Sequence, residues 1–149
     1  VNLSAIYRPL NNIFLNVLME RIRKKYICKN QIKKGTRGVR ELLRLYRKGY
    51  SIALMIDQRV SEGVKSKFFN EDAFTTTIPA QFIKKFNCKV VPIYIERFND
   101  INFNIKIEKP IEFSKDVSAV KITRDLNIWL EKMILKNPGK WIWSHNRWK

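Results

Sequence analysis

The sequence predicts an α/β fold, in which a mixed and largely parallel sheet is flanked by helices. Segments with helical apolar spacing alternate with short continuous apolar runs, and this order is typical of a sheet covered by helices. Of the 149 residues, 45% are hydrophobic and only five are glycine and five proline, which is enough apolar material for one compact core. No internal repeat or linker interrupts the chain, so residues 1–149 are predicted to form a single domain.

The N-terminal third is predicted to alternate strands and helices. Residues 1–7 are typical of the end of a strand, residues 26–28 of a short strand, and residues 51–56 of a strand buried on both faces. The first helix follows Pro9 and is amphipathic, and a second precedes Gly49. The apolar positions of these two helices are Ile13, Phe14, Val17, Leu18 and Ile22, and then Val39, Leu42, Leu43 and Tyr46.

The rest of the chain continues the pattern. Residues 57–70 are predicted to form a loop or an irregular hairpin, and a helix capped within residues 75–77 follows. Residues 89–95 are predicted as a second buried strand, and residues 102–108 as a half-exposed, antiparallel edge strand. A last helix is expected at residues 118–135. The inward positions of the two helices are Ala80, Phe82, Ile83 and Phe86, and then Ile122, Leu126, Trp129, Leu130 and Met133.

Charge indicates the class of partner. Thirty Lys and Arg oppose thirteen Asp and Glu, a net charge of +17, so the partner is expected to be acidic. The cations crowd residues 21–48, where Glu20 and Glu41 are almost the only acids nearby, which favours an anion-facing surface. Nucleic acid, anionic lipid, phosphorylated glycolipid and an acidic carrier protein all satisfy this charge. Cys28 and Cys88 have no metal-site spacing, so we predict no metal site.

Three further features are candidates for chemistry. Asp57 and Gln58 follow a predicted buried strand, which makes them either ligand-binding residues or an ordinary turn. Arg8, at a predicted strand-to-helix corner, offers a planar fork to an anion or is one solvated cation among many. The single histidine, His145, has no neighbouring carboxylate to orient it, and three nearby tryptophans favour a structural role or an interfacial belt.

Five blocks in sequence order resemble the late acyltransferases of lipid A biosynthesis, the lauroyl and myristoyl transferases, over essentially the whole chain. Two departures are Asn70 and Ile78, where the family often has glycine. The blocks are Tyr7-Arg8-Pro9 with Asn11, Met55-Ile56-Asp57-Gln58, Phe68-Phe69 with Ala73 and Thr75-Thr76-Thr77, Val90-Val91-Pro92, and Pro138 with Trp141-Ile142-Trp143-Ser144-His145-Asn146-Arg147-Trp148-Lys149.

The resemblance implies a glycerolipid-acyltransferase-like fold and transfer of a fatty acyl chain from acylated acyl carrier protein to a phosphorylated glycolipid, without metal or cofactor. The family's His-x4-Asp/Glu motif precedes the Tyr-Arg-Pro block. We therefore expect an N-terminally truncated, C-terminal part of a larger domain, with no catalytic residue of its own and no turnover alone. The substrate-binding residues implied are Arg8, Asn11, Arg21, Asp57, Gln58, Phe68, Phe69 and Thr76.

The resemblance further implies a location at the cytoplasmic face of the inner membrane, on an anionic surface, with an anchor outside these residues. Two alternatives stay open from the residues alone. One is a basic nucleic-acid-binding module, although no zinc-finger spacing or RNP-like segment supports specific nucleic-acid binding. The other is a peripheral membrane protein without catalysis.

Overall fold

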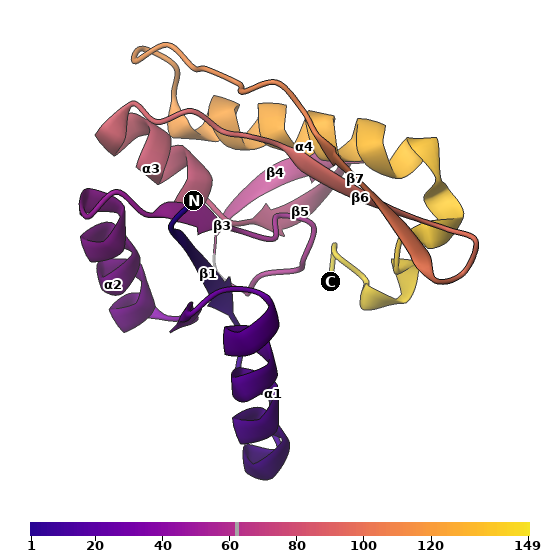
Figure 1. The fold of residues 1–149 in the computed structure, drawn as a ribbon. Coiled ribbons are helices and arrows are strands. Elements are labelled where there is room, and N and C mark those ends of the chain that lie inside the picture. The colour runs from indigo at the N-terminus through magenta and orange to yellow at the C-terminus, as the bar shows by residue number, and fades with distance from the viewer. Residues whose placement is uncertain (62) are drawn as a thin grey trace. The chain divides into compact units, whose positions relative to one another are not determined.

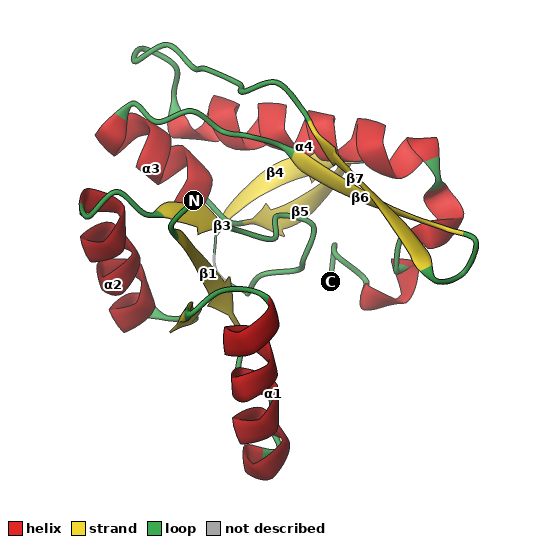
Figure 2. Ribbon diagram, viewed as in Figure 1, coloured by secondary structure: helices red, strands yellow, loops and turns green. Residues whose placement is uncertain are grey.

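Figure 1 shows a computed structural model of the chain, in which residues 1–61 and 63–149 are described. The chain divides into two compact units, Val1–Met55 and Ile56–Lys149. Both units contain helices and strands, and the first contains a parallel sheet (Figure 2). The predicted α/β class is confirmed. The expectation of a single domain stays a prediction.

The first unit is a β-α-β-α-β segment. Its three strands are all parallel and run in the order β2-β1-β3, so β1 is central and the direction of winding reverses there. In open α/β sheets, the carboxyl end of the strand at such a switch point is where ligands bind. The elements are β1 (Leu3–Tyr7), α1 (Ile13–Tyr26), β2 (Asn30–Lys33), α2 (Thr36–Arg47) and β3 (Ser51–Ala53).

Helix α2 supplies the core of this unit. It packs against all three strands and buries Leu42 and Leu45, so the predicted inward position of Leu42 is confirmed. Gly38 permits the close approach of α2 to β2, because a Cβ there would lie 2.0 Å from the carbonyl oxygen of Lys33. A side chain at this position cannot be accommodated without moving the backbone.

Helix α1 is confirmed as a helix, but it buries no residue. The prediction of a short strand at residues 26–28 is wrong. These residues lie at the end of α1 and in the following turn, and β2 begins at Asn30. The predicted strand at residues 51–56 is also shorter than expected. Only Ser51–Ala53 pairs with β1, although β1 itself continues to Tyr7.

The second unit contains two antiparallel ribbons, β4-β5 and β6-β7. Helix α4 packs on β4 and on α3, and the predicted inward positions Ile122, Leu126, Leu130 and Met133 are buried. Within residues 57–70, predicted to form a loop or an irregular hairpin, Val64–Phe68 forms β4, and its antiparallel partner β5 lies beyond the predicted range. The elements are β4 (Val64–Phe68), β5 (Glu71–Thr75), α3 (Ile78–Phe86), β6 (Ile93–Phe98), β7 (Asn102–Ile107), α4 (Ala119–Lys136) and two 3-10 turns, η1 (Pro138–Lys140) and η2 (Trp143–His145).

The β6-β7 ribbon differs from the prediction of a buried strand at residues 89–95. The strand starts at Ile93, and Ile93 and Ile95 are exposed, as are their partners Ile107 and Ile105 on β7. The antiparallel pairing of residues 102–107 is confirmed. An apolar run is typical of a strand buried on both faces, but pairing in a two-stranded ribbon covers one edge of each strand and neither of its faces.

Candidate functional site

The end of β1 is fixed by a network around Tyr7, which is 8% exposed. The Tyr7 hydroxyl donates to Oε1 of Glu20 at 2.5 Å. The same carboxylate accepts from Nδ2 of Asn16 at 2.8 Å and pairs with Nζ of Lys33 at 3.3 Å. The guanidinium of Arg23 lies over the Tyr7 ring, 5.0 Å from its centroid. One carboxylate therefore joins β1, α1 and β2.

This network sets the protonation of its two central groups. Burial, followed by the hydrogen bond to Glu20 and its charge, raises the pKa of Tyr7 to about 12. Hydrogen bonds from Tyr7 and then Asn16, together with Lys33, lower the pKa of Glu20 to about 2. At neutral pH the phenol is therefore a donor and the carboxylate a charged acceptor.

The loop between β1 and α1 is held at two points. The backbone N–H of Leu10 donates to Oδ1 of Asn16 at 2.9 Å. Asn12 caps α1 by accepting from the N–H of Leu15 at 3.1 Å, which satisfies a donor that the first turn leaves free. The loop backbone is thus positioned, while the side chains between these points remain available to a ligand.

Three predicted substrate-binding residues lie in this region. Arg8 and Asn11 are on the fixed loop at the switch point, and Arg21 is further along α1. All three side chains are exposed, and none forms a hydrogen bond or ion pair within the described part of the chain. Their donors are therefore free to bind an anion.

Lys34 and Arg37 belong to the cations that crowd residues 21–48, and the structure places these two at the same edge of the sheet. The N–H of Lys34 donates to the carbonyl of Tyr7 at 2.9 Å, which brings the end of β2 beside the end of β1. An open hollow here is lined by Lys34, Gly35 and Arg37, among others. With Arg8, this edge carries three exposed cations, an arrangement that attracts phosphate or carboxylate.

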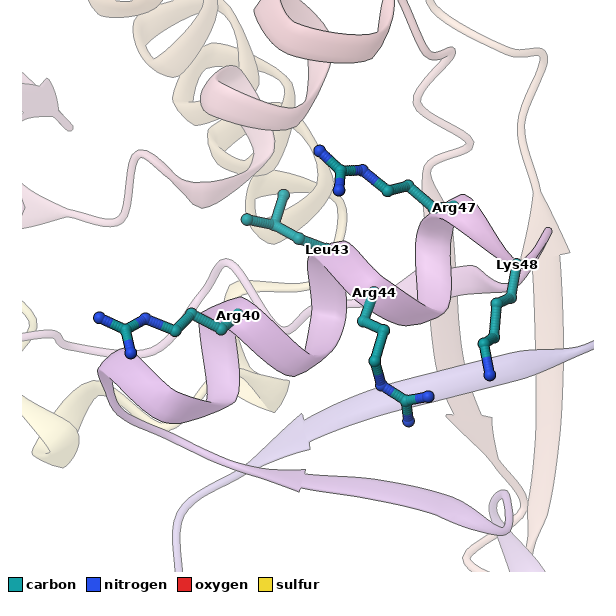
Figure 3. A pocket seen from close by; sticks show the side chains of 5 residues that line it. All are labelled: Arg40, Leu43, Arg44, Arg47 and Lys48. Atoms are coloured by element: carbon teal, nitrogen blue, oxygen red, sulfur yellow. The ribbon is translucent and has the colours of Figure 1, made fainter.

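Helix α2 carries a second group of cations. An open hollow on it is lined by Leu43 and by Arg40, Arg44, Arg47 and Lys48, and Figure 3 shows Leu43 between Arg40 and Arg47. We call these four cations the α2 stripe. Only Arg44 has an acidic partner among the described residues: its Nε donates to Glu41 at 2.9 Å. The stripe is therefore a largely uncompensated positive surface.

The second unit holds a buried cation, Arg147, which is 1% exposed. Its Nη1 donates to the carbonyl of Gln58 at 2.8 Å, and its Nη2 to Oγ1 of Thr75 at 3.3 Å and Oδ1 of Asn127 at 3.2 Å. The guanidinium carbon lies 4.6 Å from the centroid of the Phe68 ring. Arg147 thus ties the C-terminal tail to residues 57–58, β5 and α4.

Asn127 completes this network from α4. Its Nδ2 lies within 3.3 Å of Oγ of Ser66 and 3.2 Å of both the Lys67 carbonyl and Oγ1 of Thr75. The indole N–H of Trp148 donates to the carbonyl of Phe68 at 2.9 Å. The hairpin, α4 and the tail are therefore held together by buried polar groups.

Asp57 and Gln58 are anchored to the same cation. Gln58 is bound through its carbonyl and its side chain is exposed. Asp57 is half-buried, its Oδ1 has no hydrogen-bond partner among the described residues, and its charge faces Arg147. Burial lowers the pKa of Arg147, and the Asp57 carboxylate opposes that effect. The predicted pair thus sits on a fixed turn beside a buried positive charge.

The remaining predicted residues lie around the hairpin. Phe68 is fully buried and packs against Phe69, Trp141 and Trp148, whereas Phe69 is half-buried. Thr76 is half-buried, and its Oγ1 accepts from the N–H of Ile78 at 3.3 Å, at the start of α3. Their assignment to an acyl channel stays a prediction.

The C-terminal tail contains His145, whose side chain is exposed and pairs with no described carboxylate. Trp141 and Trp148 pack against the core of this unit, and Trp143 is 44% exposed. In the described part of the chain, no three His, Cys, Asp or Glu side chains gather as a metal site requires. No helix among the described residues combines the length and apolar character needed to cross a bilayer.

The chain matches a known protein family. The model of the family described as bacterial lipid A biosynthesis acyltransferase matches residues 2–149. The chain belongs to this family. A comparison with curated proteins finds no match. The resemblance seen in the five sequence blocks is therefore confirmed, and the match includes both the switch-point loop and the Arg147 network.

In this lipid A biosynthesis acyltransferase, the structure adds residues that the sequence blocks did not identify as functional. Glu20 was visible in the sequence as one of two acids, with Glu41, among many cations, which was a usable signal. Arg147 stood in a basic and aromatic tail, where charge favours exposure, and Asn127 lay unmarked on a helix. Only folding shows that these last two are buried partners.

Proposed function

We propose that this acyltransferase moves a fatty acyl chain from acylated acyl carrier protein to a hydroxyl of the phosphorylated lipid A precursor in lipopolysaccharide biosynthesis. The family match over residues 2–149 carries the proposal. In the reaction, the hydroxyl oxygen bonds to the thioester carbonyl carbon and the C–S bond breaks. The hydroxyl proton ends on the released thiol, so an ester and a free carrier thiol are formed.

Arg8 is proposed to bind a phosphate of the acceptor or the oxyanion that develops on the thioester. Its guanidinium is exposed on a fixed loop and pairs with no acid among the described residues, and the planar fork matches either anion. Asn11 on the same loop would donate its amide to the same group, and Arg21 would contact a phosphate. The fixed backbone supports this role, because a pre-positioned donor loses little entropy on binding.

Asp57 and Gln58 are proposed to shape the pocket through hydrogen bonds, on the turn that Arg147 anchors. Phe69 is half-buried and packs against Phe68, Trp143 and Trp148. Its exposed part would contact the acyl chain, and Thr76 would border the same channel. Apolar side chains are what an acyl chain requires, because its burial is driven by the hydrophobic effect.

The general base is proposed to be absent from these 149 residues. The sequence holds one histidine, and His145 is exposed with no described carboxylate to orient it, whereas a histidine base relies on such a partner. The 149-residue chain, assayed with acylated carrier and acceptor, is expected to show no turnover. Measurable transfer that His145→Ala abolishes would contradict this.

The two anionic partners are proposed to use the positive surface. The acyl carrier protein is acidic and the acceptor carries phosphates, so the α2 stripe and the cations at the sheet edge give each an attractive surface. Membrane association at the cytoplasmic face of the inner membrane is proposed on the same ground, since an anionic leaflet attracts clustered Lys and Arg.

The test is acyl transfer by the protein as encoded, including any residues outside these 149. Membranes that contain this protein are incubated with acylated carrier protein and a lipid A precursor that lacks secondary acyl chains. Mass spectrometry then measures the mass of the acceptor lipid. We expect a mass gain of one acyl chain. Transfer from acyl-coenzyme A but not from the carrier would overturn the proposed donor, and no transfer from either would overturn the function.

Arg8→Ala is the sharpest variant, with Arg124→Ala as its control, because Arg124 is an equally exposed arginine on α4. Loss of an anion-stabilising donor is expected to lower kcat/KM by about 100-fold or more, while the control retains wild-type activity. Equal activity of the two variants would remove Arg8 from the site.

A further inference from the structure

Helix α1 is oriented in an unusual way for a helix beside a sheet. Its polar residues Asn16 and Glu20 face the sheet, where they bind Leu10 and Tyr7. Its apolar residues point away from it, and Phe14 is 88% and Leu18 53% exposed. We define the α1 apolar face as Phe14, Leu15, Leu18, Ile22 and Tyr26, all of them exposed.

This orientation follows from the network around Tyr7. Positions 16, 20 and 23 share one side of a helix, because residues three and four apart are neighbours. Asn16, Glu20 and Arg23 all contact Tyr7 or its carboxylate partner, so this side is fixed against the sheet. The opposite side must then face outward. The exposure of the apolar face is therefore set by specific contacts.

Cations border the α1 apolar face. Arg21, Lys24 and Lys25 are exposed, and none of them pairs with a described carboxylate. Glu20 is the only acid in α1 and is already engaged with Tyr7 and Lys33. A helix with exposed apolar side chains on one face and unpaired cations beside them has the character of helices that lie in the head-group layer of a bilayer.

We propose that α1 inserts its apolar face into an anionic lipid surface, with Arg21, Lys24 and Lys25 among the head-group phosphates. Charge favours a bilayer over a second copy of the chain. A two-fold interface through α1 would place the cations of both copies around one contact with no acid to compensate them, and like charges repel. An anionic bilayer covers the apolar face and neutralises the cations at once.

Insertion of α1 would also bring the proposed substrate-binding loop to the membrane surface. Arg8 and Asn11 directly precede α1 on the loop held by Leu10 and Asn12. With α1 at the interface, that loop lies at head-group depth, where the phosphates of a glycolipid acceptor are. This part rests on the proposed function, whereas insertion of α1 does not require acyl transfer.

The test uses the 149-residue chain and vesicles of phosphatidylcholine, with or without about 30% phosphatidylglycerol as the anionic lipid. Co-sedimentation is expected with the anionic vesicles and to fall by about tenfold or more in Phe14→Glu/Leu18→Glu. The control is Ile105→Glu/Ile107→Glu, which adds the same charge to exposed positions of β7. This control should bind like wild type, and circular dichroism confirms that both variants are folded.

A second measurement separates insertion from charge attraction. A nitroxide label is attached to Leu18→Cys or, in a separate protein, to Arg21→Cys, both in a Cys28→Ser/Cys88→Ser background. Collision of the label with oxygen and with a water-soluble nickel complex reports its depth in the bilayer. Position 18 should lie in the acyl region and position 21 at the head groups. Equal, shallow depth at both, equal binding of both double variants, or a dimer that Phe14→Glu/Leu18→Glu dissociates, would overturn the proposal.

The outcomes distinguish this inference from the proposed function. Acyl transfer without insertion of α1 would remove the inference alone. Insertion of α1 in a protein that transfers no acyl chain would leave the inference standing and remove the proposed function.

Discussion

Tyr7 donates a hydrogen bond of 2.5 Å to Glu20, and this contact connects the central strand of the first unit to a helix that otherwise buries nothing. Tyr7 is the last residue of β1, and its contact with Glu20 turns the polar side of α1 inward. Asn16 on the same side of α1 accepts from the N–H of Leu10 and holds the loop that presents Arg8.

Loss of the Tyr7–Glu20 contact should loosen this corner and change how stability depends on pH. The pKa of Glu20 is about 2 in the fold, below that of an unfolded glutamate, so its contribution is present at neutral pH and lost as pH falls from about 4.5 toward 2. Glu20→Gln should therefore be less stable at pH 7 and converge with wild type in acid. Denaturant unfolding across pH measures this, and a constant difference would contradict it.

The phenol gives a complementary signal in alkali. The pKa of Tyr7 is raised to about 12, so its contribution is present below the unfolded value of about 10 and lost as pH rises toward 12. Absorbance at the tyrosinate band should show a late component that Tyr7→Phe removes. Tyr26→Phe, at an exposed position, is the control and should leave that component in place.

Arg147 should be essential for the stability of the second unit. Arg147→Met leaves Asn127 and the Gln58 carbonyl without their donor and Asp57 without its countercharge, and the loss should be about 3–5 kcal/mol. Arg147→Lys retains the charge but not the fork, so it should rescue only in part. Urea unfolding followed by tryptophan fluorescence measures both. Arg124→Met is the exposed control, and equal stability of all variants would contradict the assignment.

Charge reversal in the α2 stripe should weaken binding of the acidic carrier protein. Arg40→Glu/Arg47→Glu is expected to raise the Kd by about tenfold or more, with a smaller effect at high salt because the attraction is screened. Arg124→Glu/Lys132→Glu on α4 makes the same charge change at exposed positions and controls for net charge. Titration calorimetry or fluorescence anisotropy measures both, and equal weakening would show that only net charge matters.

Gly38 should tolerate no side chain. A Cβ there would meet the carbonyl oxygen of Lys33 at 2.0 Å, and since this is backbone no rotamer change relieves the overlap. Gly38→Ala is expected to destabilise the chain by about 1–3 kcal/mol. Gly139→Ala, where a Cβ meets nothing within 4 Å, should be nearly neutral. Thermal unfolding compares the two, and a neutral Gly38→Ala would mean that α2 shifts to accommodate it.

Several elements could be predicted from local pattern because their causes are local. Helix α4 has regular apolar spacing and a Ser118 cap, and the Val64–Phe68 alternation marked β4. The buried strand at residues 89–95 was predicted wrongly, because an apolar run carries no information about how many neighbours cover it. The strand predicted at residues 26–28 was wrong for a related reason. Tyr26 and Ile27 favour strands by residue type, but residue type alone does not show that they end a helix.

Some residues of the candidate site could likewise be predicted from local pattern, and others could not. Arg8, Asn11, Asp57 and Gln58 were predicted because they follow strand ends in recognisable blocks, and their role in binding stays a prediction. Arg147 and Asn127 were not, since their partners lie 89 and 61 positions away in sequence. Pairing over such separations is decided by packing of the hairpin against α4 and leaves no periodic trace.

The sequence by itself determined that the protein is a strongly cationic α/β chain with the ordered blocks of a lipid A acyltransferase. Net charge, apolar periodicity and motif order can all be read from the linear sequence without knowing which residues meet in space. Only the tertiary structure decided which cation is buried and which side of α1 faces the sheet. A helix pattern shows that two faces differ, but the contact of Glu20 with Tyr7 selects the one that turns inward. Burial is a property of the fold as a whole, and it made Arg147 a structural centre and left Arg8 free to bind.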